Sequence, residues 1–192
     1  MKEQNNIDYS SAYNIRRLGR KEMIESFDCG DADLNDFILK ESPLYRQALL
    51  AVSYVIESKQ GNHAVSAYFS LANDRVSLSD FENKTEFNRF RKHRFVNEKR
   101  LKSYPATKIC RLGVNLQAKG LHLGSFLLDF IKSYFVIENK TGCRFLTVDA
   151  YAAAIPFYLK NGFTLLNEED ANSATRLLYF DLQTIADAEL DE

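Results

Sequence analysis

The stretch from Lys108 to Ser125 constrains the fold of this chain more than any other part of its 192 residues. It begins as an apolar run typical of a strand, passes through a turn that contains Gly120, and leads into a helical pattern. The apolar residues that recur at helical spacing are Leu123, Phe126, Leu127, Phe130, Ile131, Tyr134 and Phe135. The opposite face, which is expected to meet solvent, carries Asp129, Lys132, Ser133 and Glu138. The pattern therefore predicts a strand, a glycine turn and a long amphipathic helix.

Glycines in front of a helix favour one kind of ligand. The first amide N–H groups of a helix have no intrahelical acceptor, and the helix dipole places positive potential at that end. A phosphate-bearing ligand fits such a site. The alternative is that Gly120 and Gly124 serve only as tight-turn residues, and the pattern alone leaves both interpretations open.

The same stretch resembles the pyrophosphate-binding segment of the GCN5-related N-acetyltransferases. In that family a strand precedes a turn of the type Arg/Gln-x-x-Gly-x-Gly/Ala and a helix with paired leucines. One register starts at Gln117 and keeps Gly120, but it places His122 where the family has a small residue. The preferred register also keeps Ser125 and the pair Leu127-Leu128, and it aligns Lys119-Gly120-Leu121-His122-Leu123-Gly124. It departs from the family pattern at Lys119 and at His122.

The resemblance implies how acetyl-CoA would be bound. Main-chain groups of Leu112 and Val114 would hold the acetyl and pantetheine parts. The diphosphate would lie on the turn formed by Lys119, Gly120, Leu121, His122, Leu123, Gly124 and Ser125.

A second block carries the predicted catalytic residue. Val148-Asp149-Ala150 followed by Phe157-Tyr158 and Gly162-Phe163 resembles the D-A-x and F-Y-x-x-x-G-F segments of the same family. The resemblance implies that Tyr158 is the acid that protonates the departing thiolate. The alternative is that Tyr158 is a core aromatic residue.

An N-terminal phrase resembles the toxin-type branch of the family. It consists of Phe27-Asp28-Cys29-Gly30 and a following helix with Leu34, Phe37 and Ile38, which in that branch lines the acceptor side. We expect Asp33 to cap this helix and Pro43 to end it. A simple turn before a helix would give the same phrase.

A basic insert over residues 79–103 is the one local charge excess. Its Arg89–Lys102 run interleaves cations with Phe90 and Phe95. It is either a solvated helix with an aromatic underside or a surface for the phosphates of an RNA acceptor or of the coenzyme A ribose. RNA specificity would need aromatic residues that stack on bases.

The order of elements predicts an α/β fold in one domain. We expect a strand at 13–18, a hairpin across 47–71 with a turn at 59–62, the strand-turn-helix, a parallel strand at 144–150, a short helix before Gly162 and a terminal β-pair. This order fits the GCN5-related acetyltransferase fold, a mixed central sheet flanked by helices. The domain would span 13–182, between a flexible arm at 1–12 and an acidic tail at 183–192.

Composition excludes several classes of protein. The net charge of −1 gives no global attraction to nucleic acid or anionic membrane, and the hydrophobic content of 45% supports a substantial core. The three cysteines show no metal-ligand spacing, so no metal site is predicted. The N-terminus is too polar for a signal peptide, and no apolar run could span a membrane, so we expect a cytoplasmic protein.

The most specific interpretation is an acetyl-CoA-dependent N-acetyltransferase that acetylates a primary amine, with the amino group of an aminoacyl-tRNA as a toxin-like acceptor. Two alternatives stay open. One is acetylation of a small molecule or a protein, and the other is a non-enzymatic module that binds coenzyme A or RNA on the same fold. The sequence is also compatible with a homodimer.

Overall fold

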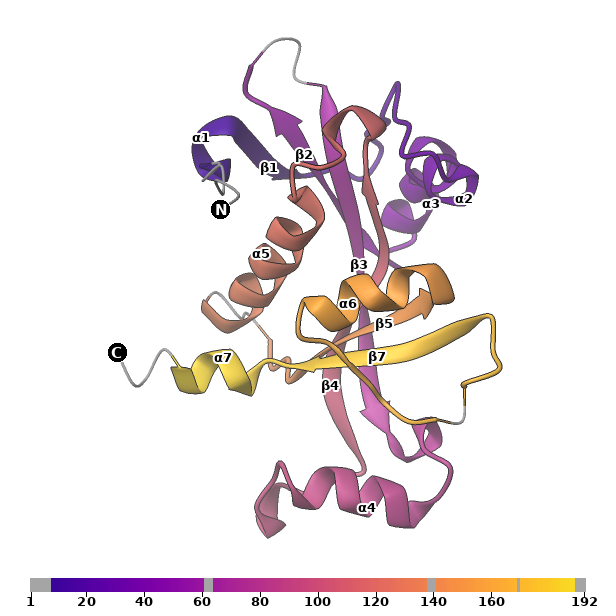
Figure 1. Ribbon diagram of the computed structural model, residues 1–192, viewed down its shortest axis with the longest axis vertical. Helices are drawn as coiled ribbons and strands as arrows, with labels where there is room; N and C mark the ends of the chain where they lie inside the picture. Colours follow the sequence, from indigo (N-terminus) through magenta and orange to yellow (C-terminus); the bar gives the residue numbers. More distant parts are fainter. Residues whose placement is uncertain (1–7, 61–63, 138–140, 169, 189–192) are drawn as a thin grey trace, which may run out of the picture. The chain divides into compact units, whose positions relative to one another are not determined.

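The computed structural model describes residues 8–60, 64–137, 141–168 and 170–188. Figure 1 shows an α/β protein whose strands form one mixed sheet in the order β1-β2-β3-β4-β5-β7-β6, with helices beside it. The α/β class and the mixed sheet predicted from the sequence are confirmed. Contacts divide the chain into two compact units, and each is described by itself. The first unit contains residues 1–72 and 110–127, and the second contains 73–109 and 128–192.

The first unit is built on the predicted hairpin. Strand β1 (Tyr13–Arg17) pairs antiparallel with β2 (Val52–Ser58), which pairs antiparallel with β3 (Val65–Ser77). The hairpin is confirmed, but its first strand begins at Val52 and not at residue 47, which ends a helix. Residues 61–63 of its predicted turn lie outside the described part of the chain. A core cluster beneath these strands contains Leu18, Phe27, Phe37, Ile38, Val55 and Tyr68.

The helical segment after residue 31 corrects two expectations. Helix α2 (Ala32–Asp36) is capped by Asp31, whose carboxylate accepts from the Leu34 N–H at 3.0 Å, so Asp33 is not the cap. The chain then continues through a π-helical turn at Phe37–Glu41 into α3 (Ser42–Gln47). Pro43 does not end the helix, because it lies in the first turn of α3, where a missing N–H is tolerated.

The second unit contains the parallel crossover strand and the terminal β-pair. Strand β4 (Ser103–Val114) pairs parallel with β5 (Phe145–Tyr151) over Ala106–Lys108, and β5 pairs antiparallel with β7 (Thr175–Asp181). Strand β6 (Thr164–Leu165) pairs antiparallel with β7. The predicted parallel strand and β-pair are confirmed. Helix α4 (Lys84–Lys92) belongs to the basic insert.

Helix α5 (Leu123–Ile137) begins where the turn ends, as predicted. Its N-terminal residues up to Leu127 belong to the first unit and the remainder to the second. One residue of its predicted solvent face is buried: Lys132 is only 7% exposed. Its ammonium donates to Asp129 at 3.0 Å and to the Asn161 carbonyl at 2.9 Å, and it lies over the Phe180 ring. These partners explain how the charge is accommodated in a buried position. Glu138, predicted on the same face, lies outside the described residues.

Both predicted chain ends contain short helices. Helix α1 (Tyr9–Ala12) is capped by Asp8, within the segment expected to be an arm, and α7 (Gln183–Ala188) occupies the start of the acidic tail. Residues 1–7 and 189–192 are outside the described ranges. Across the described residues, we find no helix with the length and apolar character needed to cross a bilayer.

Candidate active site

Hydrogen bonds of Asn115 hold the start of the predicted turn. After β4, the Asn115 N–H donates to the Ser66 carbonyl at 2.9 Å, and the Asn115 side chain accepts from the Gln117 N–H at 3.0 Å. A 3-10 turn at Leu116–Ala118 follows. These bonds direct the chain away from the sheet and toward the start of α5.

Two residues of the turn have left-handed backbone conformations. Gly120 has a φ of +83°, and His122 has a φ of 55°. Gly120 needs no Cβ for this conformation, whereas His122 holds one of the two positive φ angles found among the described non-glycine residues. The family has glycine at the His122 position in the preferred register, so the backbone explains why a glycine suits that position.

The start of α5 has open amide groups. In the described part of the chain, the first helix-type bond at this end is from the Phe126 N–H to the His122 carbonyl at 3.2 Å. The amides of Leu123, Gly124 and Ser125 precede it, and the first amides of a helix have no acceptor within the helix. No heavy atom lies within 4 Å of the place where a Cβ on Gly120 would be. The turn thus offers donors and open space, which suits a diphosphate.

The Phe27–Gly30 phrase packs directly on this turn. The Leu116 N–H donates to the Asp28 carbonyl at 2.8 Å, and a Cβ on Gly30 would lie 3.2 Å from Leu116. The Asp28 carboxylate accepts from the side chain of Asn35 at 2.9 Å and from the Gly30 N–H at 2.8 Å. These bonds, together with the nearby Lys119 ammonium, lower the pKa of Asp28. The phrase is therefore a structural support of the turn.

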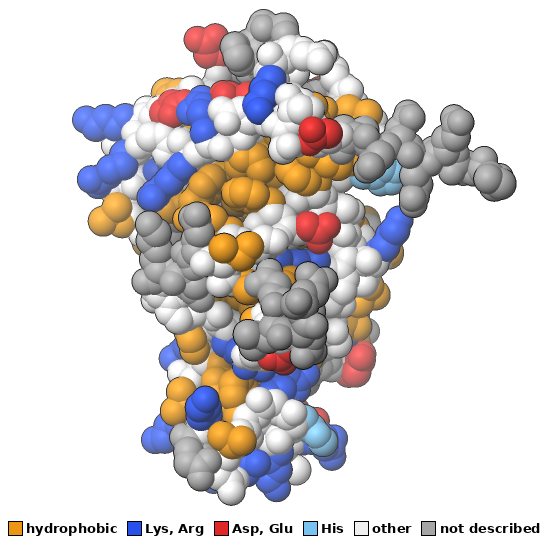
Figure 2. All heavy atoms as spheres, turned by 90° about the vertical axis from the view of Figure 1, so that its left-hand side faces the viewer, with side chains coloured by type: hydrophobic (Ala, Val, Ile, Leu, Met, Phe, Trp, Pro, Cys, Tyr) orange, Lys and Arg blue, Asp and Glu red, His pale blue; other side chains and the backbone are white. Residues whose placement is uncertain are grey.

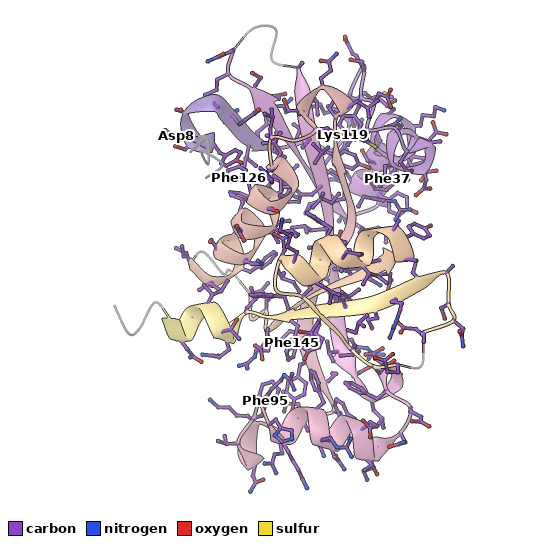
Figure 3. The ribbon with its side chains drawn as sticks, in the orientation of Figure 1. Asp8, Phe37, Phe95, Lys119, Phe126 and Phe145 are labelled. Atoms are coloured by element: carbon purple, nitrogen blue, oxygen red, sulfur yellow. The ribbon has the colours of Figure 1, made fainter. Side chains whose placement is uncertain are left out.

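Tyr9 is a residue of the site that sequence reasoning missed. Its hydroxyl donates to the Leu121 carbonyl at 2.8 Å, and its ring stacks on Phe126 with 4.4 Å between centroids. Figure 3 labels Phe126, which lies beside the segment that begins at Asp8. Tyr9 thus contacts the turn and the first residues of α5 together. No motif marked it, because a single tyrosine in a polar segment has no periodicity.

Gly113 lets the strand before the turn pack closely against two aromatic rings. A Cβ on Gly113 would lie 2.8 Å from the Tyr68 ring and 3.3 Å from the Phe27 ring, so a side chain does not fit. Side chains alternate along a strand, so the side chains of Leu112 and Val114 point to the face opposite these rings. The parallel pairing of β4 with β5 ends at Lys108, although both strands continue. A glycine inside a predicted strand was the available signal of this close approach.

Tyr158, the predicted acid, lies in the second unit on α6 (Ile155–Lys160). It is 7% exposed, and its ring contacts those of Phe157 and Phe163 at 5.1 and 5.4 Å. Burial raises its pKa to about 12. Its carbonyl accepts from the Phe163 N–H at 3.0 Å, just beyond Gly162, whose φ is +82°. The helix end and the ring contacts fix this tyrosine in place.

The aromatic residues of the basic insert are core residues. Phe87 and Phe90 are buried in a cluster with Phe81, Tyr104, Phe145 and Tyr179, and Phe95 stacks on Tyr104 at 4.0 Å. Figure 3 labels Phe95 and Phe145, whose rings meet edge to face at 6.3 Å. These rings are not free to stack on bases. The stacking that RNA specificity would need is therefore not available from these rings, whereas the predicted aromatic underside is confirmed.

No protein-family model matches the chain, and no curated protein matches it. Solved structures do. A tyrosine-to-phenylalanine mutant of KacT aligns with a TM-score of 0.73 at 19% identity, over 92% of this chain and 99% of that chain. AtaTR bound with acetyl-CoA aligns with a TM-score of 0.70 at 20% identity, over 91% and 96%. AtaT complexed with acetyl-methionyl-tRNAfMet aligns with a TM-score of 0.67 at 19% identity, over 90% and 96%. At these identities the likeness establishes the fold, and the chain has the GCN5-related acetyltransferase fold in the form found in KacT and AtaT.

Proposed function

We propose that this protein is an acetyl-CoA-dependent N-acetyltransferase of the toxin type, and that its acceptor is the amino group of an aminoacyl-tRNA. The observation that carries the proposal is the turn before α5, where Gly120 and His122 take positive φ angles and the following amides are open. AtaT, whose fold this chain shares, has been solved with acetyl-CoA and with acetyl-methionyl-tRNAfMet.

The residues of the turn fit the diphosphate of acetyl-CoA. The amides of Leu123, Gly124 and Ser125 would donate to its oxygens, and the exposed Lys119 would add a positive charge. The His122 side chain is exposed, so it can turn outward or add a further donor. Main-chain groups of Leu112 and Val114 would hold the acetyl and pantetheine parts, as the family resemblance implies.

Acetyl-CoA supplies an activated acetyl group, and the protein must position the amine and stabilise the leaving thiolate, which takes its proton from water. Tyr158 is fully protonated at physiological pH, because its pKa is raised to about 12. Full transfer of its proton to a thiolate of pKa about 8.5 would cost roughly 5 kcal/mol. The role that fits is hydrogen-bond donation to the sulfur as negative charge develops. We assign no base, and the amine proton is lost to water.

The acceptor is the finer part of the proposal. Two readings compete with aminoacyl-tRNA: a small amine or protein acceptor, and a non-enzymatic module that binds coenzyme A or RNA. Aminoacyl-tRNA as the acceptor draws support from the AtaT complex and from a group of cations that have no carboxylate partner among the described side chains. The predicted homodimer has no bearing on this choice and stays a prediction.

Acetyl transfer to purified aminoacyl-tRNA tests the proposed function. The wild type should form N-acetyl-aminoacyl-tRNA, and Tyr158→Phe should lower kcat on the order of 10²-fold, the range expected for the loss of one hydrogen-bond donor to developing negative charge. The affinity for acetyl-CoA should stay nearly unchanged, because the substitution keeps the ring and removes only the hydroxyl. The matched control is Tyr45→Phe, which also removes a tyrosine hydroxyl but at an exposed position on α3.

Other outcomes separate the alternatives. Acetylation of free amines or peptides without acetylation of charged tRNA would support the small-amine or protein reading. Acetyl-CoA binding without transfer to any amine would leave the non-enzymatic reading. Unaltered turnover of Tyr158→Phe would show that Tyr158 is only a core residue.

A further inference from the structure

A cationic pocket lies in the second unit, and none of its lining residues is assigned above to acetyl-CoA. It has a volume of about 850 Å³ and lies between the end of β3, the helix α4 and the start of β4. Its lining includes five cationic side chains, those of Arg75, Lys84, Arg91, Arg100 and Lys102. In Figure 2, Lys and Arg side chains gather at the lower end of the molecule, around α4. We call this feature the α4 pocket.

The cations of the α4 pocket are not neutralised by carboxylates. Among the described side chains, none of the five forms an ion pair. The lining residues include no Asp or Glu. The carboxylate of Asp80 contacts one lining residue, Ser77, but it is held by the Ser77 N–H at 2.7 Å and the Ser77 hydroxyl at 3.2 Å. The pocket therefore concentrates positive charge.

Two buried polar atoms of the pocket residues lack partners. Within the described part of the chain, Asn88 Oδ1 and Arg91 Nε are buried without a hydrogen bond. Arg91 also donates through its Nη1 to the carbonyls of Arg100 and Leu101, at 3.3 and 3.1 Å, and lies over the Phe87 ring. These contacts fix its guanidinium in the pocket wall and leave the Nε–H without an acceptor among the described residues. Both atoms are shielded from the pocket, so a ligand there would meet the exposed cations of the wall.

We infer that the α4 pocket binds the sugar-phosphate backbone of the RNA acceptor, an inference that rests on the proposed function. The exposed cations Arg75, Lys84 and Lys102 would meet phosphate oxygens. The insert offers no free aromatic ring for base stacking, because Phe87, Phe90 and Phe95 are packed in the core. Binding is therefore independent of base sequence and strongly dependent on salt.

The structure favours RNA over an acidic peptide for two reasons. An RNA strand presents phosphates at regular intervals, which suits cations that come from β3, from α4 and from the segment before β4. The pocket wall also contains the hydroxyl groups of Ser79 and Ser103, and serine hydroxyls are common donors to phosphate.

Binding of uncharged tRNA to the full chain, measured by fluorescence anisotropy across a salt series, tests the inference. The test variant is Arg75→Gln/Lys84→Gln/Lys102→Gln, since these three side chains are exposed. The control variant is Lys21→Gln/Lys92→Gln/Lys99→Gln, which removes the same charge from exposed positions outside the pocket. We expect the test variant to bind at least about tenfold more weakly and its salt slope to shrink by about 2, whereas the control changes little.

A second measurement separates this inference from the proposed function. Both variants should bind acetyl-CoA as the wild type does. A wild type that does not bind acetyl-CoA would contradict the proposed function, whereas the difference in tRNA binding between the two variants would still test the pocket. If folding of the triple variant is impaired, the single variant Lys102→Glu should weaken tRNA binding in the same direction.

Three results would overturn the inference. Equal loss of tRNA binding in the test and control variants would show that only net charge matters. A loss of acetyl-CoA affinity in the test variant would assign the pocket to a phosphate of coenzyme A. Competition by a poly-glutamate peptide with affinity equal to that of tRNA would assign it to an acidic protein partner.

Discussion

At the scale of single residues, Tyr9 and His122 shape the turn before α5. His122 occupies a left-handed conformation that costs a non-glycine residue roughly 1 kcal/mol or more, so other contacts must hold it there. Tyr9 provides such contacts, because its hydroxyl bonds the carbonyl next to His122 and its ring covers Phe126. Under the proposed function Tyr9 is a positioning residue, because it would act on acetyl-CoA through the turn.

Substitution of Tyr9 should weaken acetyl-CoA binding in two steps. Tyr9→Phe removes the bond to Leu121 and should raise the Kd about 3- to 10-fold, which corresponds to one hydrogen bond of about 1 kcal/mol. Tyr9→Leu also removes the stacking on Phe126 and should raise it further. Calorimetric titration of each variant with acetyl-CoA gives the Kd.

Tyr13→Phe is the matched control, because Tyr13 lies in the neighbouring strand β1 and its ring centroid is 6.4 Å from that of Tyr9. It should bind acetyl-CoA as the wild type does. A purely structural role for Tyr9 would lower the melting temperature in all three variants while leaving the Kd of the folded protein unchanged, and that pattern would contradict the positioning role.

At the scale of elements, the basic insert serves two different ends. One set of its cations lines the α4 pocket, and another attaches α4 to the sheet. Arg94 belongs to the second set: it donates to the Phe90 carbonyl at 3.0 Å and to the Tyr179 hydroxyl, and it lies 3.6 Å from Asp181. Its guanidinium also lies 4.1 Å from the centroid of the Phe90 ring. A run that looks uniform in sequence therefore contains two kinds of cation: some line the α4 pocket, and others bond to the sheet.

Arg94→Gln should destabilise the protein, while Lys92→Gln should not. Loss of the Arg94 contacts should lower the free energy of unfolding by about 1–3 kcal/mol, since the Tyr179 hydroxyl and the Asp181 carboxylate lose a charged partner. Lys92 is exposed, and its substitution should change the free energy by less than about 0.5 kcal/mol. Urea denaturation of both variants gives the two values. Equal stability would mean that Arg94 is as dispensable as a surface cation.

At the scale of the whole molecule, the fold could be predicted where sequence periodicity reports burial. The strand-turn-helix from Lys108, the hairpin and the strand at Phe145–Tyr151 all follow from apolar patterns that one face of an element must bury. Pro43 misled the helix prediction, because its effect depends on whether a new first turn begins there. Lys132 could not be predicted as buried, because its partner Asn161 is 29 residues away in sequence.

The site was predictable only in part for the same reason. The turn carries a local pattern of glycines, so its residues could be named from the sequence. Tyr9 lies 112 residues from Leu121, and the α4 pocket draws cations from a strand end, a helix and the segment before β4. Neither arrangement leaves a local pattern, because both depend on tertiary packing.

Isothermal titration of the protein with acetyl-CoA tests the central claim most directly. The wild type should bind at one site, and Gly124→Asp should abolish binding, because a carboxylate at the second residue of α5 repels the diphosphate and occupies its amide donors. The variant should still fold, since an acid in the first turn favours the helix. Gly124→Ala, the uncharged control, should bind within a few fold of the wild type. A wild type that does not bind acetyl-CoA, or a Gly124→Asp variant that binds it equally well, would contradict the account.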